Sequence, residues 1–432
     1  MKKPQKTTAL KPRRARRATA LITSGILALT LCGGCSSTAD EPVNLAVQSG
    51  DETTSVTFFS PMEKVSADSE NTARTASDLT MAMAEDQLGL TVSYQTYTAE
   101  NYQDKTYDDV CLERARNNRD DMYLLNTDAI VALGKEGKLA DLSQLACAKN
   151  LREVVKTANT VDGKLVAIPQ EVVAYGLFIN EDIFKECGLS MPNAPVGANR
   201  WWLETFVFAQ AYADLYNGGD IEAEVAALNS GEKKYSDYMR SGFEFLKQLM
   251  DAGYIDAENA LVSEAFEGKG EGAEFMAGEC PIVMAYWGAA NTDTAYGNPS
   301  FNLEVIGFPS SHGQMPVLSM TGFAVGEESA NKEEALAVMG VILSDEALQL
   351  YTETNRVISP SKNIKVDCID ALKPLNQKVE DEIYVLASNA SMNVEQWGNV
   401  CLIVRDLLAG ASVDECMAAL DALQEEAIAT AQ

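Results

Sequence analysis

The sequence predicts an α/β protein built from two lobes of ordinary domain size. Strand patterns alternate with helical stretches of about 10–15 residues, which is typical of parallel sheets covered by helices. About 380 residues follow residue 51, enough for two lobes, and no internal repeat or low-complexity tract is present. Ligands bind beyond the carboxyl ends of strands in such sheets, so we expect the functional site there.

The first block of the chain, up to residue 168, shows this alternation clearly. Its strand patterns are short and rich in β-branched and aromatic residues, and its helical patterns repeat apolar residues at helical spacing. Strands are predicted at 56–59, 90–94 and 121–125, and helices at 70–87, 105–118 and 127–136.

The pattern continues in a second block. Strands are predicted at 173–179, 282–285 and 317–325. Helices are predicted at 200–216, 235–252 and 332–343, and the tail from 366 is largely helical, with good apolar periodicity over 398–427.

The N-terminus carries an export signal. Residues 1–17 hold eight cations and no acid, and an apolar run of 14 residues follows, too short to span about 30 Å of hydrocarbon. The next stretch, Leu31-Cys-Gly-Gly-Cys35, resembles a bacterial lipobox, although the lipobox usually has an aliphatic residue where Cys32 stands. We therefore expect a lipoprotein signal peptide over 1–34, a lipid on Cys35 and a flexible tether over 35–51. An ordinary signal peptide is the alternative.

The charge of the chain excludes some partners. The whole chain carries −29 and residues 1–34 carry eight positive charges, so the mature chain carries −37. Such a surface repels nucleic acid and anionic lipid headgroups, so membrane attachment would come from the lipid on Cys35.

Cysteine and histidine usage argues against a metal site. The mature chain holds seven further cysteines at scattered spacings, which is not a disulfide framework, and its only histidine is His312. The sequence predicts neither a metal site nor a cofactor.

Several segments, in order, resemble the extracellular solute-binding proteins of ABC transporters, in the sugar-binding group similar to maltose-binding protein. They are Asp121–Asp128 with Gly137–Ser143, then Asp162–Pro169 with Tyr175–Asn180 and Phe184–Leu189, and later Phe275–Met284 with Tyr286-Trp287. The sequence departs from the family pattern at 193–202, where extra residues precede a doubled tryptophan, Trp201-Trp202.

The resemblance implies a two-lobed periplasmic-binding-protein-like fold of type II, with the cleft between the lobes. Lobe 1 would comprise 52–168 and 301–344, and lobe 2 would comprise 169–300 and 345–432. It also implies a monomer on the outer face of the bacterial cytoplasmic membrane that binds a carbohydrate, expected to be an oligosaccharide, and delivers it to permease subunits.

Sugar recognition needs aromatic faces for the C–H faces of the rings, and carboxylates or amides for the hydroxyls. By resemblance the candidate ligand-binding residues are Trp287, Trp397 and Asp128. Their positions add Asn126 in the loop of Asp128, Tyr175 and Tyr286 on strands near the lobe junctions, and Gln170 at the expected hinge, where it could face the cleft or solvent. Core packing is the alternative for the tryptophans and tyrosines, and we expect it for at least one of Trp201 and Trp202. Asp128 could instead be an N-terminal helix acid, and Asn126 a turn residue.

The sequence contains few of the motifs that would indicate an enzyme. With one histidine, Ser-His-Asp or Cys-His catalysis would have to use His312, and no G-x-S-x-G, P-loop or H-E-x-x-H motif is present. A glycosidase needs only two carboxylates, so composition leaves it open. The nearer alternative keeps the fold but binds a peptide, a polyamine or another solute that is not a sugar.

Overall fold

The computed structural model describes residues 54–61, 64, 75–98, 101–102, 105–191, 193–199, 202–263, 270–291 and 299–431. All of them belong to one compact unit, Pro42–Gln432. The predicted signal peptide, Cys35, the tether and Trp201 lie outside the described residues.

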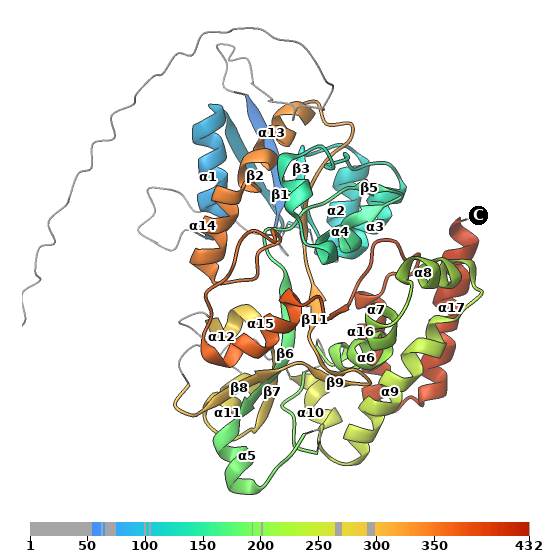
Figure 1. Ribbon diagram of the computed structural model, residues 1–432. Coiled ribbons are helices and arrows are strands. Elements are labelled where there is room, and N and C mark those ends of the chain that lie inside the picture. The colour runs from blue at the N-terminus through green and yellow to red at the C-terminus, as the bar shows by residue number, and fades with distance from the viewer. Residues whose placement is uncertain are drawn as a thin grey trace, which may run out of the picture. The chain divides into compact units, whose positions relative to one another are not determined.

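The first sheet has the strand order β12-β3-β1-β2. β1 (Ser55–Ser60) pairs in parallel with β2 (Thr91–Thr96) and β3 (Met122–Leu125), while β12 (Gly322–Val325) runs antiparallel to β3. Figure 1 shows helices on both sides of this sheet. On one side are α1 (Ala76–Leu88), α13 (Lys332–Ile342) and α14 (Asp345–Asn355), and on the other α2 (Tyr107–Arg116), α3 (Thr127–Lys135) and α4 (Glu153–Asn159). The predicted parallel α/β arrangement is confirmed for β1, β2 and β3.

The second sheet is organised around β6 (Val173–Asn180) and is mainly antiparallel. One edge of β6 pairs with β7 (Ile282–Tyr286), and the other pairs first with β11 (Val317–Ser319) and then with β8 (Leu303–Ile306). These three pairings are antiparallel, and only β11 with β13 (Val385–Leu386) is parallel. The expected parallel arrangement is therefore wrong for this sheet, because β6 pairs with strands that return from far along the chain and not with a neighbour joined by one helix.

Helices form the outer part of the second lobe. α9 (Tyr235–Asp251) packs on α6 (Glu204–Ala211) and on α17 (Val413–Ala431), and α16 (Trp397–Leu408) contacts both α6 and α17. The shorter helices are α5 (Glu181–Cys187), α7 (Ala213–Asn217), α8 (Ile221–Ser230), α10 (Ala257–Val262), α11 (Glu271–Met276), α12 (Trp287–Asn291) and α15 (Lys373–Glu380). Two small hairpins pair β4 (Thr160–Val161) with β5 (Lys164–Leu165) and β9 (Phe308–Ser310) with β10 (Gly313–Met315). Two short 3₁₀ helices span Ala146–Asn150 and Asp370–Leu372.

The single strand predicted at 317–325 is two strands in different sheets. β11 lies in the second sheet, β12 lies in the first, and Met320 and Thr321 connect them. The range 301–344, expected in lobe 1, therefore straddles both sheets, since β8 and β11 pair with β6. α14, expected in lobe 2, packs on α1 beside the first sheet (Figure 1).

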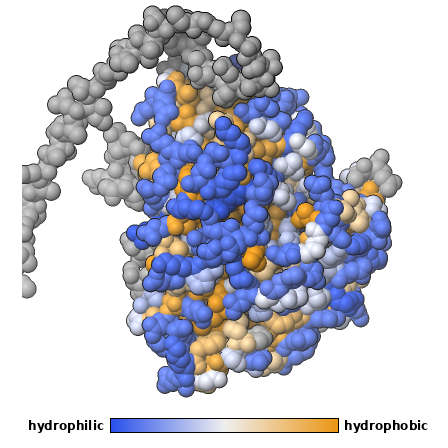
Figure 2. Space-filling model, viewed as in Figure 1, coloured by the Kyte–Doolittle hydropathy of each residue, from blue (hydrophilic) through white to orange (hydrophobic). Residues whose placement is uncertain are grey.

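The surface on the face drawn in Figure 2 is largely hydrophilic, with smaller hydrophobic patches between the polar areas. Among the described residues no single helix is long and apolar enough to cross a membrane, and only the bent pair α13 and α14 reaches that length and composition together. Five of the seven cysteines after Cys35 are buried. The described part of the chain holds no cluster of three or more metal-ligating side chains.

Candidate ligand-binding site

A cavity of about 360 Å³ lies where the carboxyl end of β3 faces residues of the second lobe. Its lining residues are Asn126, Thr127, Asp128, Tyr175, Trp202, Ser319, Met320, Thr321, Ser388 and Trp397. In the first sheet, β2 lies on one side of β1 and β3 on the other, so strand order reverses at β1. This is the position where open α/β sheets bind ligands.

The junction of β3 and α3 supplies the polar wall of the cavity. Asn126 is the N-cap of α3, with an extended backbone, and its Oδ1 accepts a hydrogen bond from the backbone N–H of Ala129 at 3.0 Å. Asp128 falls in the first turn of that helix. A cap of this kind fixes the start of the helix, so both side chains are held at the strand end.

Aromatic rings form the opposite wall. The ring of Tyr175, on β6, lies 5.4 Å from that of Trp397 and 6.1 Å from that of Trp202, between centroids. Trp202 also meets Tyr286 edge to face at 6.4 Å. Phe208, buried on α6, stacks at 6.0 Å behind Trp397 and holds it in place.

The cavity brings together four of the seven candidate residues, namely Asn126, Asp128, Tyr175 and Trp397. Tyr286 is not among its lining residues, but it pairs with Tyr175 across β6 and β7 and contacts Trp202.

The structure places the other two candidates elsewhere. Trp287 is 1% exposed in the hydrophobic core, and its Nε1–H donates to the backbone oxygen of Arg356 at 3.0 Å. Gln170 is 3% exposed, and its amide donates to Thr80 Oγ1 at 2.9 Å and to the Ile342 oxygen at 3.1 Å. Both side chains therefore connect segments of the core.

Trp202 lies in the cavity, although the sequence favoured core packing for at least one of the doubled tryptophans. The segment before it runs along the edge of β7, where the N–H of Gly197 donates to the Ile282 oxygen at 2.8 Å. Asn199 then donates to the buried carboxyl of Glu271 at 2.6 Å. The departure from the family pattern at 193–202 was the sequence signal for this residue. Ser319, Met320, Thr321 and Ser388 had no such signal.

Acidic side chains gather at the rim beside Asp128. Asp128 hydrogen-bonds with Glu395, and burial together with the charge of Glu395 raises the pKa of the Asp128 carboxyl well above its usual range. Burial also raises the pKa of Asp108, which hydrogen-bonds with the Asn126 side chain. Asp128 therefore keeps its proton at neutral pH, and its hydrogen bond with Glu395 connects the two lobes.

A second hollow of about 690 Å³ continues beyond Asp128. Its lining residues are Asp128, Val131, Ala132, Lys135, Glu136, Asp162, Asn393, Glu395, Ala427 and Thr430. Lys135 on α3 crosses it and donates to Asn393 Oδ1 at 2.6 Å. Because Asp128 lines both hollows, a ligand in the aromatic cavity could extend into this one.

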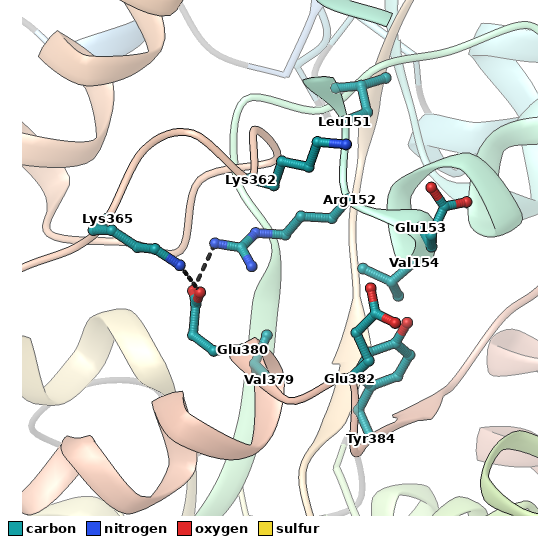
Figure 3. Close-up of a pocket in the computed structure, with 10 residues that line it drawn as sticks. All are labelled: Leu151, Arg152, Glu153, Val154, Lys362, Lys365, Val379, Glu380, Glu382 and Tyr384. Atoms are coloured by element: carbon teal, nitrogen blue, oxygen red, sulfur yellow. Dashed lines mark hydrogen bonds and ion pairs between the residues drawn. The ribbon is translucent and has the colours of Figure 1, made fainter. Parts of the chain in front are cut away.

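A third cavity, of about 230 Å³, lies between α4 and α15 (Figure 3). Arg152 and Lys365 both point at the carboxylate of Glu380, and the Arg152 guanidinium lies 2.7 Å from it. Arg152 also donates to the backbone oxygen of Ser359 at 2.8 Å. The central charges are thus already paired within the protein, so this cavity is a structural junction and not a candidate site.

A cavity with aromatic and polar walls between two α/β lobes defines a protein that holds a small solute. Residues 79–367 match the model of the bacterial extracellular solute-binding protein family, so the chain belongs to this family. A comparison with curated proteins gives no match.

Solved structures share the fold. A family 1 extracellular solute-binding protein from Bifidobacterium longum subsp. infantis matches with a TM-score of 0.67 at 16% identity, over 87% of this chain and 99% of that one. A chitin oligosaccharide binding protein matches with a TM-score of 0.66 at 18% identity, over 87% and 99%. RafE from Streptococcus pneumoniae matches with a TM-score of 0.61 at 15% identity, over 88% and 100%. At these identities the structures establish the two-lobed fold.

Proposed function

We propose that this chain is the substrate-binding lipoprotein of an ABC importer, and that it binds a carbohydrate in the cavity between Asp128 and the aromatic wall. The observation that carries the proposal is the composition of that cavity. Tyr175, Trp202 and Trp397 offer ring faces, and the residues opposite them offer a carboxyl, an amide and hydroxyls. Sugars need both kinds of surface, because their rings have apolar C–H faces and polar edges.

The dimensions favour an oligosaccharide. The cavity of about 360 Å³ and the adjoining hollow of about 690 Å³ share Asp128, so one chain of sugar rings could occupy both. Ligand sites in proteins commonly have volumes of about 300–1,000 Å³. Two structural neighbours agree with this size, since one is named for binding chitin oligosaccharide and RafE has been solved in complex with raffinose.

Both lobes contribute residues to the cavity, so a bound ligand can favour closure of the lobes. Asn126 and Asp128 come from the first lobe, and Tyr175 and Trp397 from the second. A ligand that contacts both walls when the lobes are closed, and one wall when they are open, stabilises the closed form by that difference in affinity. The closed form would dock onto the permease, and the lipid on Cys35 would keep the protein at the membrane surface. The mechanism needs no chemical step.

The test is ligand binding to the soluble chain from residue 36, which contains the whole compact unit Pro42–Gln432. We expect a neutral or charged oligosaccharide to raise the melting temperature with increasing concentration. Trp202→Ala and Trp397→Ala should each weaken binding by about tenfold or more, since a buried aromatic contact contributes at least 1.4 kcal/mol.

A variant on the same helix serves as the control. Leu402 on α16 is 55% exposed, so Leu402→Ala should leave sugar binding unchanged. If the two tryptophan variants bind sugar as well as the control does, the ligand is not in this cavity. If no sugar binds and a peptide does, the carbohydrate assignment is wrong and the solute-binding role stands.

A further inference from the structure

We propose that Glu271, which lies outside the cavity, is a positioning residue for ligand binding, because through Asn199 it holds Trp202 in the aromatic wall. The inference rests on the proposed function and names a residue that sets the affinity of the same site. Glu271 is the first residue of α11 and is 3% exposed, and it is not among the residues that line the cavity. Any effect of its carboxyl group on a ligand must therefore pass through other residues.

The carboxyl group of Glu271 connects two separate segments of the second lobe. One of its oxygens accepts a hydrogen bond from the Asn199 amide at 2.6 Å, and the other accepts one from the Ser263 hydroxyl at 2.5 Å. A carboxyl group is costly to bury, and hydrogen bonds of this kind offset the cost. The bond from Ser263 ties the end of α10 to α11. The bond from Asn199, which is 1% exposed, reaches the segment that leads to Trp202.

The backbone between Asn199 and the cavity is fixed at both ends. The N–H of Trp202 donates to the Asn199 oxygen at 3.4 Å, and the Trp202 oxygen accepts hydrogen bonds from the N–H of Thr205 at 3.0 Å and from its Oγ1 at 2.5 Å. The segment also packs directly on Glu271, because a Cβ atom on Gly197 would lie 2.8 Å from the Glu271 Cβ. A change at the Glu271 carboxyl group is therefore transmitted to the backbone of Trp202.

The ring of Trp202 needs this support because it is only half-buried. It lines the cavity and contacts Tyr175 and Tyr286, which belong to the same wall. Side chains that bind a ligand keep their geometry through the packing and hydrogen bonds of the residues behind them. A side chain that is free before binding must be ordered by the ligand, and this lowers affinity. Loss of the bond between Asn199 and Glu271 should therefore weaken binding by about two- to tenfold.

The first measurement observes Trp202 directly and needs no ligand. The soluble chain from residue 36 contains four tryptophans. Labelling with 5-fluorotryptophan gives each of them a fluorine NMR signal, which is assigned by replacing that tryptophan with phenylalanine. Asn199→Ala removes the amide that donates to Glu271. We expect the signal of Trp202 to shift or broaden in this variant, and the signal of Trp287 in the hydrophobic core to stay unchanged.

The second measurement is calorimetry with raffinose and with chitin trisaccharide. We expect Asn199→Ala to weaken binding by about two- to tenfold, and to have no further effect in a chain that already carries Trp202→Ala, since its action passes through that ring. Asn199→Asp places two carboxyl groups together and should also weaken binding. Combining it with Glu271→Gln restores one donor and one acceptor in exchanged positions, so the double variant should recover both the affinity and the Trp202 signal.

The control is a second buried asparagine of the same lobe. Asn180, at the end of β6, is 2% exposed and caps α5 by accepting hydrogen bonds from the N–H groups of Asp182 and Ile183. Asn180→Ala removes these bonds without touching the segment that leads to Trp202. It should lower the melting temperature but leave sugar binding and the Trp202 signal unchanged. The melting temperature of each unliganded variant shows whether it is folded.

The outcomes separate this inference from the proposed function. An unchanged Trp202 signal in Asn199→Ala, or an equal loss of binding in Asn180→Ala, would overturn the inference and leave the proposed function in place. A shifted Trp202 signal with unchanged affinity would also overturn it, because the position of the ring would then not matter to the ligand. If neither sugar binds the unmodified chain, the carbohydrate function fails for these two sugars, and the fluorine signals still decide whether Glu271 positions Trp202.

Discussion

The side chain of Asp128 meets two opposing influences. It lies in the first turn of α3, where the positive end of the helix dipole favours a negative charge. The N–H of Gly398 also hydrogen-bonds to it and lowers its pKa, but burial and the neighbouring Glu395 outweigh these effects and raise the pKa. Burial is therefore the main cause and the second carboxyl group adds to it, so Asp128 is poised to change its charge when a ligand changes its surroundings.

Glu171 allows the effect of burial to be measured alone. Burial raises the pKa of its carboxyl group from the ordinary value to about 7, and no charged partner contributes. A raised carboxyl pKa makes the folded state bind the proton more tightly, so the destabilisation begins above the unfolded pKa and is complete above about pH 7.

We expect Glu171→Gln to raise the free energy of unfolding at pH 8 by up to about 3 kcal/mol and to have little effect at pH 4. Urea unfolding of both proteins at the two pH values measures this difference. The same gain at pH 4 as at pH 8 would mean that the effect comes from packing and not from the charge.

At the scale of helices, the contact of α6 with α9 shows how closely the second lobe is packed. Gly242 lies in the middle of α9 and is buried against α6. A Cβ atom at this position would lie 2.5 Å from the backbone oxygen of Val207 and 2.7 Å from its Cα atom. Backbone atoms cannot move aside easily, so the glycine sets the distance between the two helices. α6 also carries Phe208, which stacks on Trp397 in the cavity wall.

We expect Gly242→Ala to destabilise the protein by about 1–3 kcal/mol, because the added methyl group forces α6 and α9 apart. Gly340 on α13 is the matched control, since a Cβ atom there has no neighbour within 4 Å. Gly340→Ala should stabilise the protein by up to about 1 kcal/mol through helix propensity alone. Thermal unfolding of the two variants measures both changes in stability. If Gly242→Ala leaves the stability unchanged, α9 can shift away from α6 without destabilising the protein.

Over the whole molecule, the sequence predicted the positions of helices and strands better than it predicted which strands pair with each other. The strand at 56–59 and the helix at 235–252 were found because periodicity reports which face of an element is buried. Periodicity does not report the partner, so the antiparallel pairing of β6 with β7, about a hundred residues later, could not be predicted. The switch of the chain between sheets at Met320 and Thr321 was missed for the same reason.

The sequence predicted one part of the candidate site, namely the polar residues at the end of a strand, but not which aromatic residues face them. Asp128 and Asn126 follow a recognisable strand, so their place at its end could be inferred. The sequence could not decide which tryptophan binds ligand, because Trp287 and Trp202 both border strands or turns. Only tertiary packing decides which of them faces the cavity. The three-dimensional arrangement assigns Trp287 to the core and Trp202 to the wall.

The net charge of the whole chain should affect how fast a charged ligand arrives. With residues 1–34 removed the chain carries −37, so a negative field surrounds the whole molecule. Such a field raises the association rate of a cation and is screened by salt over about 10 Å at 0.1 M. A neutral sugar has no charge to be steered, so we expect its association rate to change little between 0.01 M and 0.15 M salt. Stopped-flow tryptophan fluorescence measures the association and dissociation rates, because Trp202 and Trp397 line the cavity. If salt slows association by about tenfold and hardly changes the dissociation rate, the ligand is a cation such as a polyamine and the carbohydrate assignment is wrong.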